Sequence, residues 1–100
     1  MNFNIIWSPK AQKTYYDTVI YLLENWTEKE ARKFVDRTQV VINHIAKNYL
    51  LYPYSKEGDI YKAVINWQIS LFYRVKGINI ELLVFWDNRQ RPSKLKKIIK

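Results

Sequence analysis

The chain has 100 residues, 48% of them hydrophobic, and its 17 Lys and Arg outnumber its 9 Asp and Glu to give a net charge of +8. This length suits one domain with its own core. Cysteine is absent, which excludes disulfides, a thiol nucleophile and a cysteine-based metal site, and favours a reducing compartment. Because no run of about 18 apolar residues or signal-peptide pattern occurs, we expect a soluble cytoplasmic protein.

The positive charge is concentrated at the C-terminal end. Residues 88–100 contain six Lys or Arg and no acid, so the first 87 residues are nearly balanced, with eleven cations against nine acids. A basic C-terminal segment on a protein whose other charges nearly cancel predicts attraction to nucleic acid, to the ribosome or to an acidic protein. The alternative is a solvated end whose charge only aids solubility.

A short strand and a helix open the chain. Phe3, Ile5 and Trp7 alternate with polar or exposed positions, which is typical of a strand. Ser8 followed by Pro9 is a helix start, because the hydroxyl accepts from free amides and proline suits the first turn. The expected buried stripe consists of Ala11, Tyr15, Thr18, Val19, Leu22, Leu23 and Trp26.

A second helix follows almost at once. Thr27 with Glu30 three residues later predicts a capped N-terminus. Two helices with so short a connection should form an antiparallel hairpin whose apolar stripes cover a sheet. The second stripe consists of Ala31, Phe34, Val35, Thr38, Val41, Ile42 and Ile45.

Residues 60–89 predict a three-stranded antiparallel meander, rich in β-branched and aromatic residues. Gly77 tolerates the positive φ of a tight hairpin. Pro92 then opens a short basic helix or tail. This order predicts one α+β domain over residues 1–100, with the helical hairpin on one face of a small antiparallel sheet. Alternation places Ile69, Leu71, Tyr73, Val75, Ile80, Leu82, Val84 and Trp86 on the covered face.

The other face of this meander is the candidate functional surface. Lys62, Arg74 and Arg89 are predicted there, among the apolar side chains of Phe72, Leu83 and Phe85. A face that mixes cations with aromatic residues suits a polyanion or a partner chain. The alternative is that the C-terminal segment covers the three apolar side chains.

The sequence contains few other chemical groups. Two glycines exclude a glycine-rich phosphate loop, and His44 alone does not make a metal site. Five cations on and after the meander remain: Lys62, Arg74, Arg89, Arg91 and Lys94. Cations can position a phosphodiester and stabilise its developing charge. If the substrate is RNA, its 2′-hydroxyl can attack without a metal or cofactor. The proton acceptor and donor would come from Glu57, Asp59, Tyr61, Tyr73 or Glu81.

The run IYKAVINWQISLFYRVKGINIELLVFWDNRQRPSKL and the order of elements resemble the RelE/ParE superfamily of bacterial type II toxins. IIWSPKAQKTYYDTVIYLLENW is similar to the opening strand and first helix of that superfamily. SLFYRV and ELLVFWDNRQ are similar to its last two strands. The resemblance implies a toxin without a cofactor that an antitoxin, expected to be acidic, wraps and neutralises. The antitoxin is expected on the apolar patch formed by Phe72, Leu83 and Phe85.

The two branches of the superfamily imply different activities. The activity we expect is that of the RelE-like branch, which cleaves messenger RNA on the ribosome without a metal; the resemblance implies Arg89, Lys62 and Arg74 as its catalytic residues. Two departures stand against it, because Ser70 and Leu95 occupy positions where members of that branch have Arg and Tyr. The ParE-like branch poisons DNA gyrase without such residues. A third alternative is a degenerate member that binds only its antitoxin and operator DNA. Nucleic acid is expected to contact Arg91, Lys94, Lys96 and Lys97; in the ParE-like alternative this basic segment binds gyrase.

Overall fold

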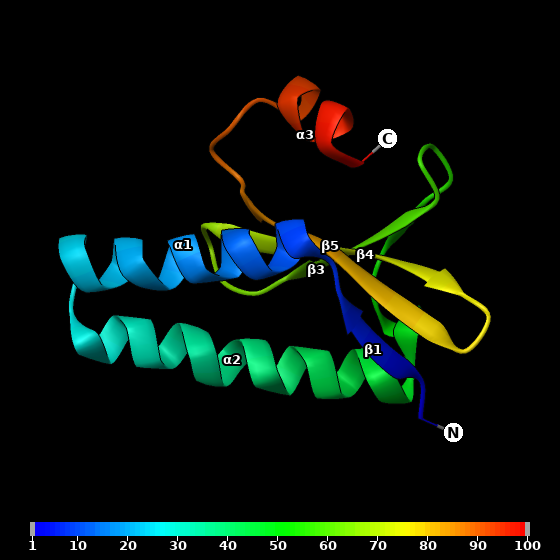
Figure 1. Ribbon diagram of the computed structural model, residues 1–100, viewed down its shortest axis with the longest axis horizontal. Coiled ribbons are helices and arrows are strands. Elements are labelled where there is room, and N and C mark those ends of the chain that lie inside the picture. The colour runs from blue at the N-terminus through cyan, green and yellow to red at the C-terminus, as the bar shows by residue number, and fades with distance from the viewer. Residues whose placement is uncertain (1, 100) are drawn as a thin grey trace.

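The computed structural model describes residues 2–99 as one five-stranded sheet with helices on both faces (Figure 1). In chain order the elements are β1 (Asn4–Trp7), α1 (Pro9–Asn25), α2 (Glu28–Lys47), the 3-10 turn η1 (Tyr49–Leu51), β2 (Tyr54–Ser55), β3 (Ile60–Val64), β4 (Ile69–Lys76), β5 (Asn79–Asp87) and α3 (Pro92–Ile99). The predicted α+β class, helical hairpin, meander and C-terminal helix are confirmed.

The strand order is β1-β5-β4-β3-β2, so β5 lies between the meander and the N-terminal strand. The meander is antiparallel, whereas β1 runs parallel to β5 at the edge of the sheet. Two features extend the predicted sheet: this parallel edge, and the two-residue strand β2, which pairs with β3. No helix among residues 2–99 is long and apolar enough to cross a membrane.

Side-chain caps begin both long helices as expected. Ser8 Oγ accepts a hydrogen bond from the Ala11 amide at 3.0 Å, and Thr27 Oγ1 accepts one from the Glu30 amide at 3.1 Å. The buried stripe of α1 is narrower than predicted. Leu23 and Trp26 are 50% and 54% exposed, because the end of α1 extends beyond the sheet (Figure 1).

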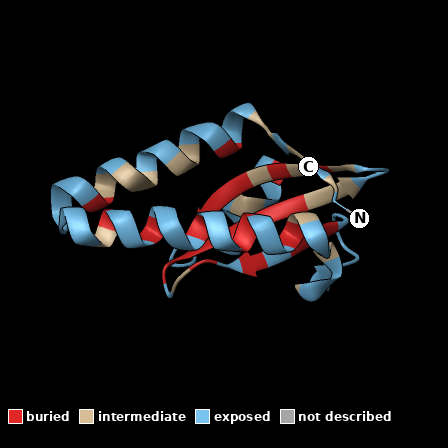
Figure 2. Ribbon diagram, turned by 90° about the horizontal axis from the view of Figure 1, so that it is seen from below, coloured by how far each residue is buried: buried red, intermediate tan, exposed pale blue. Residues whose placement is uncertain are grey.

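Two hydrophobic clusters lie on opposite faces of the sheet. The larger one joins α1 and α2 to the centre of the sheet, and its fully buried side chains include Phe34, Ile45, Leu71, Tyr73, Ile80 and Leu82. Figure 2 shows buried residues concentrated in the central strands and recurring at intervals along the two long helices. The smaller cluster lies beneath α3 and consists of Ile60, Phe72, Val84, Trp86 and Ile99, with Leu83 and Leu95 packed against it.

A β-bulge at Leu83 decides which side chains of β5 reach each cluster. Phe72 pairs with Val84 and Tyr73 pairs with Leu82, so Leu83 is an extra residue in β5. One extra residue reverses the alternation that follows it. Val84 therefore lies under α3 and Phe85 under the helical hairpin. The predictions that Val84 and Trp86 share a face with Leu82, and that Phe85 lies on the other face, are wrong for this reason.

Hydroxyl groups of Ser8, the N-cap of α1, and of Thr14 within α1 complete the backbone pairing of β5 where β1 ends. Ser8 Oγ donates to the Leu83 carbonyl at 3.0 Å. The Phe85 amide donates to Thr14 Oγ1 at 2.9 Å. Because buried backbone groups without partners are costly, these two contacts stabilise the bulge and hold α1 against the edge of β5.

Candidate functional site

The structure separates the three predicted catalytic cations. Lys62 pairs with Phe72 across β3 and β4, so both face α3, and Arg74 lies on the same face. Arg89 instead lines a pocket against α1, on the side of the helical hairpin. The prediction that Arg74 and Arg89 share a face is wrong. The bulge turns the end of β5 toward the hairpin, and Arg89 follows it.

Arg74 attaches α3 to the sheet. Its guanidinium donates to the carbonyls of Gly58 at 2.8 Å, Asp59 at 3.2 Å and Ile99 at 3.1 Å. The last of these carbonyls belongs to the C-terminal turn of α3, where the helix dipole favours a cation. Arg74 thus joins the turn before β3 to the end of α3, and its donors face main-chain oxygens.

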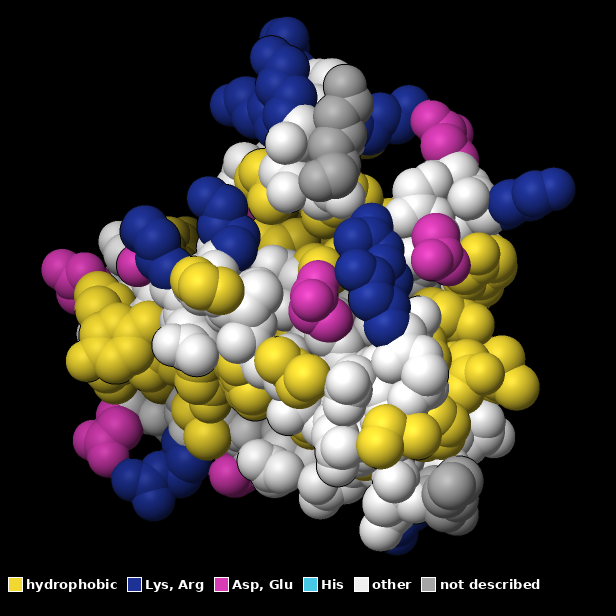
Figure 3. Space-filling view, turned by 45° about the vertical axis from the view of Figure 1, so that its right-hand side comes forward, with side chains coloured by type: hydrophobic (Ala, Val, Ile, Leu, Met, Phe, Trp, Pro, Cys, Tyr) yellow, Lys and Arg dark blue, Asp and Glu magenta, His cyan; other side chains and the backbone are white. Residues whose placement is uncertain are grey.

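The predicted nucleic-acid contacts lie on or just before α3. Arg91, Lys94, Lys96 and Lys97 are exposed, and Figure 3 shows Lys and Arg side chains gathered at the end of the molecule that α3 forms. Lys96 forms an exposed ion pair with Glu57 at 3.3 Å. Lys100, the last cation of the basic segment, lies outside the described residues.

The predicted apolar partner patch is divided and covered. Phe72 is buried beneath α3, and Leu83 packs against the same cluster. Phe85 belongs to the other core, where its ring lies 5.6 Å from that of Trp7 and 5.2 Å from that of Tyr15. The alternative that the C-terminal segment covers the apolar side chains is therefore correct for Phe72 and Leu83.

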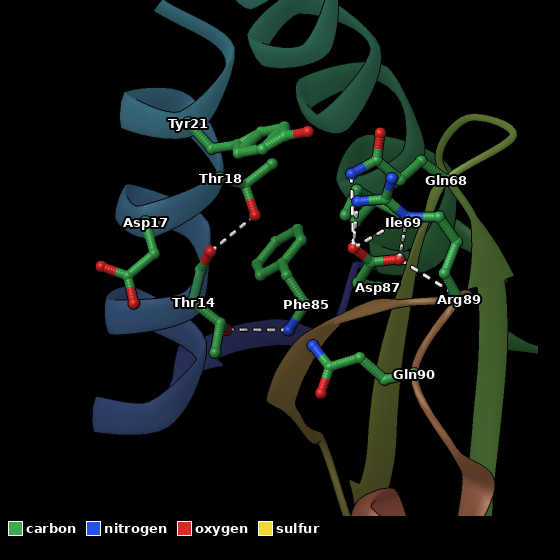
Figure 4. A pocket seen from close by; sticks show the side chains of 10 residues that line it. All are labelled: Thr14, Asp17, Thr18, Tyr21, Gln68, Ile69, Phe85, Asp87, Arg89 and Gln90. Atoms are coloured by element: carbon green, nitrogen blue, oxygen red, sulfur yellow. Dashed lines mark hydrogen bonds and ion pairs between the residues drawn. The ribbon is translucent and has the colours of Figure 1, made fainter. Parts of the chain in front are cut away.

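The structure forms a pocket of about 270 Å³ between α1 and the ends of β4 and β5 (Figure 4). Tyr21 and Thr18 line it from α1. Gln68, just before β4, and Asp87 and Arg89, at and after the end of β5, line it from the sheet side. Sequence reasoning did not identify these neighbours of Arg89. Asp87 and Arg89 stand two residues apart at the end of the last predicted strand, and this spacing was the sequence signal for a contact between them.

Asp87 orients Arg89 within this pocket. The Arg89 Nη2 and Nε atoms donate to Asp87 at 2.8 Å and 3.1 Å, and the Arg89 amide donates to the same carboxylate at 2.9 Å. These contacts hold the pKa of Asp87 below its ordinary value, against the opposing effect of burial. In turn, the hydrogen bond to Asp87 raises the pKa of Arg89, and a smaller contribution comes from Tyr21. Both groups are therefore ionised at neutral pH.

Comparison with known proteins identifies the fold. Neither the protein-family profiles nor the curated protein sequences match this chain. Solved structures do match it over 85% of its length. In the chromosomal ParDE TA system from P. aeruginosa, the TM-score is 0.71 with 17% identity over 95% of that chain. The chain shares the fold of this matched protein.

Two further structures support this fold. The YoeB dimer from Staphylococcus aureus matches 85% of this chain and 95% of its own, with a TM-score of 0.59 and 23% identity. The heterotetrameric YoeB–YefM toxin–antitoxin complex from the same organism matches 85% of this chain and 95% of its own, with a TM-score of 0.55 and 22% identity.

Ser70 and the predicted proton carriers do not line the pocket of Arg89. Ser70 is fully buried and donates to Asn88 Oδ1 at 2.9 Å. Tyr73 is also fully buried; its hydroxyl donates to the Tyr49 carbonyl at 2.7 Å, and burial raises its pKa. The remaining candidates, Glu57, Asp59, Tyr61 and Glu81, do not line the pocket of Arg89 either. No group of three or more His, Asp or Glu side chains within residues 2–99 could hold a metal ion.

Proposed function

We propose that this chain is the toxin of a type II toxin–antitoxin module and that an acidic antitoxin neutralises it. The shared fold supports this proposal, because the matching chains come from ParDE and YoeB–YefM systems. The charge supports it as well. A net charge of +8, with exposed cations gathered around α3, favours an acidic protein partner.

We further propose that the toxin acts in the ParE-like way, by binding DNA gyrase, without cleaving RNA. The observation that carries this proposal is the separation of Arg89 from Lys62 and Arg74 by the sheet. Cleavage requires the catalytic groups to reach one scissile phosphodiester together, within hydrogen-bonding distance. Side chains on opposite faces of a sheet cannot meet at one phosphate. Arg74 also donates to three main-chain carbonyls, which favours a structural role.

One observation favours the second candidate, cleavage of ribosome-bound messenger RNA. Arg89 is oriented by Asp87 in an open pocket, which is how a cation that stabilises a transition state is positioned. In this candidate mechanism Arg89 acts without Lys62 and Arg74. Arg91, Lys94 and Lys97 would hold the RNA backbone.

Induction of the chain in a bacterial host, without antitoxin, separates these functions. We expect growth arrest, double-strand DNA breaks and intact transcripts. Arg89→Ala should preserve the arrest, as should the matched control Lys29→Ala on the exposed face of α2. Reversing the charge of Lys94 and Lys97 should weaken the arrest, while Leu95 and Ile99 keep α3 in place.

Two results would overturn this assignment. Transcript cuts that disappear in Arg89→Ala, with arrest lost in the same variant, would establish RNA cleavage. Normal growth at full expression of soluble protein would leave the third alternative, a degenerate member that binds only its antitoxin and operator DNA. If the neighbouring gene encodes a small acidic protein, its co-expression should restore growth and yield a stable complex.

A further inference from the structure

The pocket of Arg89 has an apolar interior and an aromatic wall. The side chains of Phe85 and Ile69 line it and are themselves buried. Figure 4 shows Tyr21 projecting from α1 across the opening, toward Gln68 and Arg89. A flat ring bound in this space would contact apolar side chains on one side and the face or edge of Tyr21 on the other. Both contacts would remove the ring from water.

The polar groups of the pocket combine donors with acceptors. Gln68 is buried and its amide nitrogen lies 3.4 Å from Asp87 Oδ2, so its side chain is held in one orientation. Gln90, which is exposed, lines the same pocket. A carboxamide offers an acceptor and a donor side by side, which is the pattern that pairs with the edge of a nucleobase.

The charges in the pocket disfavour a charged ligand. Arg89 is paired with Asp87 at 2.8 Å. Asp17, also on the lining, forms an ion pair with Lys13 at 2.7 Å. An anion would face two carboxylates, and a cation would compete with Arg89 for Asp87. An uncharged ring that carries hydrogen-bonding groups suits the pocket better than either.

Besides Arg89, two cations follow the lining residues of the pocket along the chain. Arg91 follows Gln90 directly in the chain, and Lys94 is the third residue of α3; both side chains are exposed. We propose that the pocket binds a nucleobase, either in a free nucleoside or unpaired in a single strand. In a strand, the base occupies the pocket while the phosphates on either side meet Arg91 and Lys94. Because this is a property of the purified protein, it does not depend on how growth is inhibited.

Titration of the ¹⁵N-labelled chain with single ligands tests the proposal. The probes are the four ribonucleosides, single-stranded hexaribonucleotides of each base, a duplex RNA and inorganic phosphate. We expect at least one nucleoside to shift the backbone amides of Thr18, Gln68, Ile69 and residues 87–90. The matching hexanucleotide should bind more tightly, shift residues 91–97 in addition, and lose affinity as salt increases. Equal affinity for nucleoside and hexanucleotide would identify a free nucleoside as the ligand.

Two pairs of variants complete the test. Tyr21→Leu should weaken nucleoside binding about tenfold, the loss of one aromatic contact to a base. Tyr16→Leu, on an exposed part of the same helix, should not change it. Gln90→Ala should weaken binding without affecting the fold, because Gln90 is exposed, and Gln12→Ala on α1 is its control.

Three results would overturn the proposal. One is the absence of shifts at the pocket with all four nucleosides. Another is a response to oligonucleotides that is confined to residues 91–99 and equal for single strand and duplex, which would indicate only electrostatic attraction. The last is wild-type affinity in folded Gln90→Ala and Tyr21→Leu. If Tyr21→Leu does not fold, Gln90→Ala and its control decide the question.

Discussion

The attachment of α3 by Arg74 gives the sharpest test of this structure. α3 has eight residues, and a helix of that length is marginal in water without tertiary contacts. The contacts that hold it are the buried side chain of Ile99, the partly buried Leu95, and the hydrogen bond from Arg74 to the Ile99 carbonyl at 3.1 Å. We therefore expect Arg74→Ala to release α3 selectively.

The size of the effect follows from these contacts. A hydrogen bond from a charged group contributes about 1.5–3 kcal/mol when buried. Arg74 is only partly buried, so screening by water reduces its contribution to about 1–1.5 kcal/mol. Since about 1.4 kcal/mol corresponds to a factor of ten, opening of α3 should become about tenfold more frequent. Ile99→Ala, which removes buried methyl groups, should cost about 2 kcal/mol and release α3 further.

Hydrogen exchange followed by mass spectrometry measures this opening. The peptide covering residues 92–99 should exchange about tenfold faster in Arg74→Ala, and peptides from α2 should be unchanged, because α3 can open without the larger core. Lys76→Ala, an exposed cation on the same strand, is the matched control. Unchanged exchange in α3, or equal acceleration in α2, would refute the reasoning.

Three other predictions concern single buried or paired groups. Tyr73→Phe should destabilise the fold to urea by about 1–2 kcal/mol, because the Tyr49 carbonyl loses its donor. Since burial raises the pKa of Tyr73, its contribution is present below the ordinary value of 10.0 and decreases as the pH rises, so the variant should lose less stability in alkali. Arg89 lowers the pKa of Asp87, so the contribution of the Asp87 carboxylate to stability is complete above its ordinary pKa of 3.8 and is lost as the pH falls. The melting temperature of Asp87→Asn should therefore depend less on acid pH than that of the wild type. Ser8→Ala should cost about 1–2 kcal/mol in thermal unfolding, because it removes a helix cap and the donor to the bulge carbonyl.

Exposed residues of the same types provide the controls. Tyr16→Phe, Asp36→Asn and Ser93→Ala alter side chains at the surface and should leave stability almost unchanged. Equal losses in the variants and these controls would contradict the assigned contacts. A Tyr73→Phe variant with wild-type alkaline sensitivity would show that other groups cause the alkaline transition.

Much of the fold was predictable because its signals are local. Ser8, Thr27 and Glu30 mark the helix starts through contacts within four residues. The alternation in β4 placed Leu71 and Tyr73 in the larger core and Phe72 on the other face, as observed. Each of these features depends on the backbone geometry of one segment.

The candidate site was less predictable, and β5 shows why. Residues 82–86 read LLVFW, so every position is apolar and either alternate set can face the helices. Only pairing with β4 introduces the bulge at Leu83. The bulge sends Phe85 to one core and Val84 to the other, and it carries Asp87 and Arg89 to the pocket beside α1.

The amino-acid sequence by itself determined the helices, the meander, the basic C-terminal segment and the fold class, because caps, periodicity and composition act over short distances. The tertiary structure alone decided which face each cation occupies, that α3 covers Phe72, and that Asp87 orients Arg89. Those outcomes depend on one additional residue in β5 and on contacts between residues far apart in the chain. The alternation of residues within one segment encodes neither the bulge nor these long-range contacts.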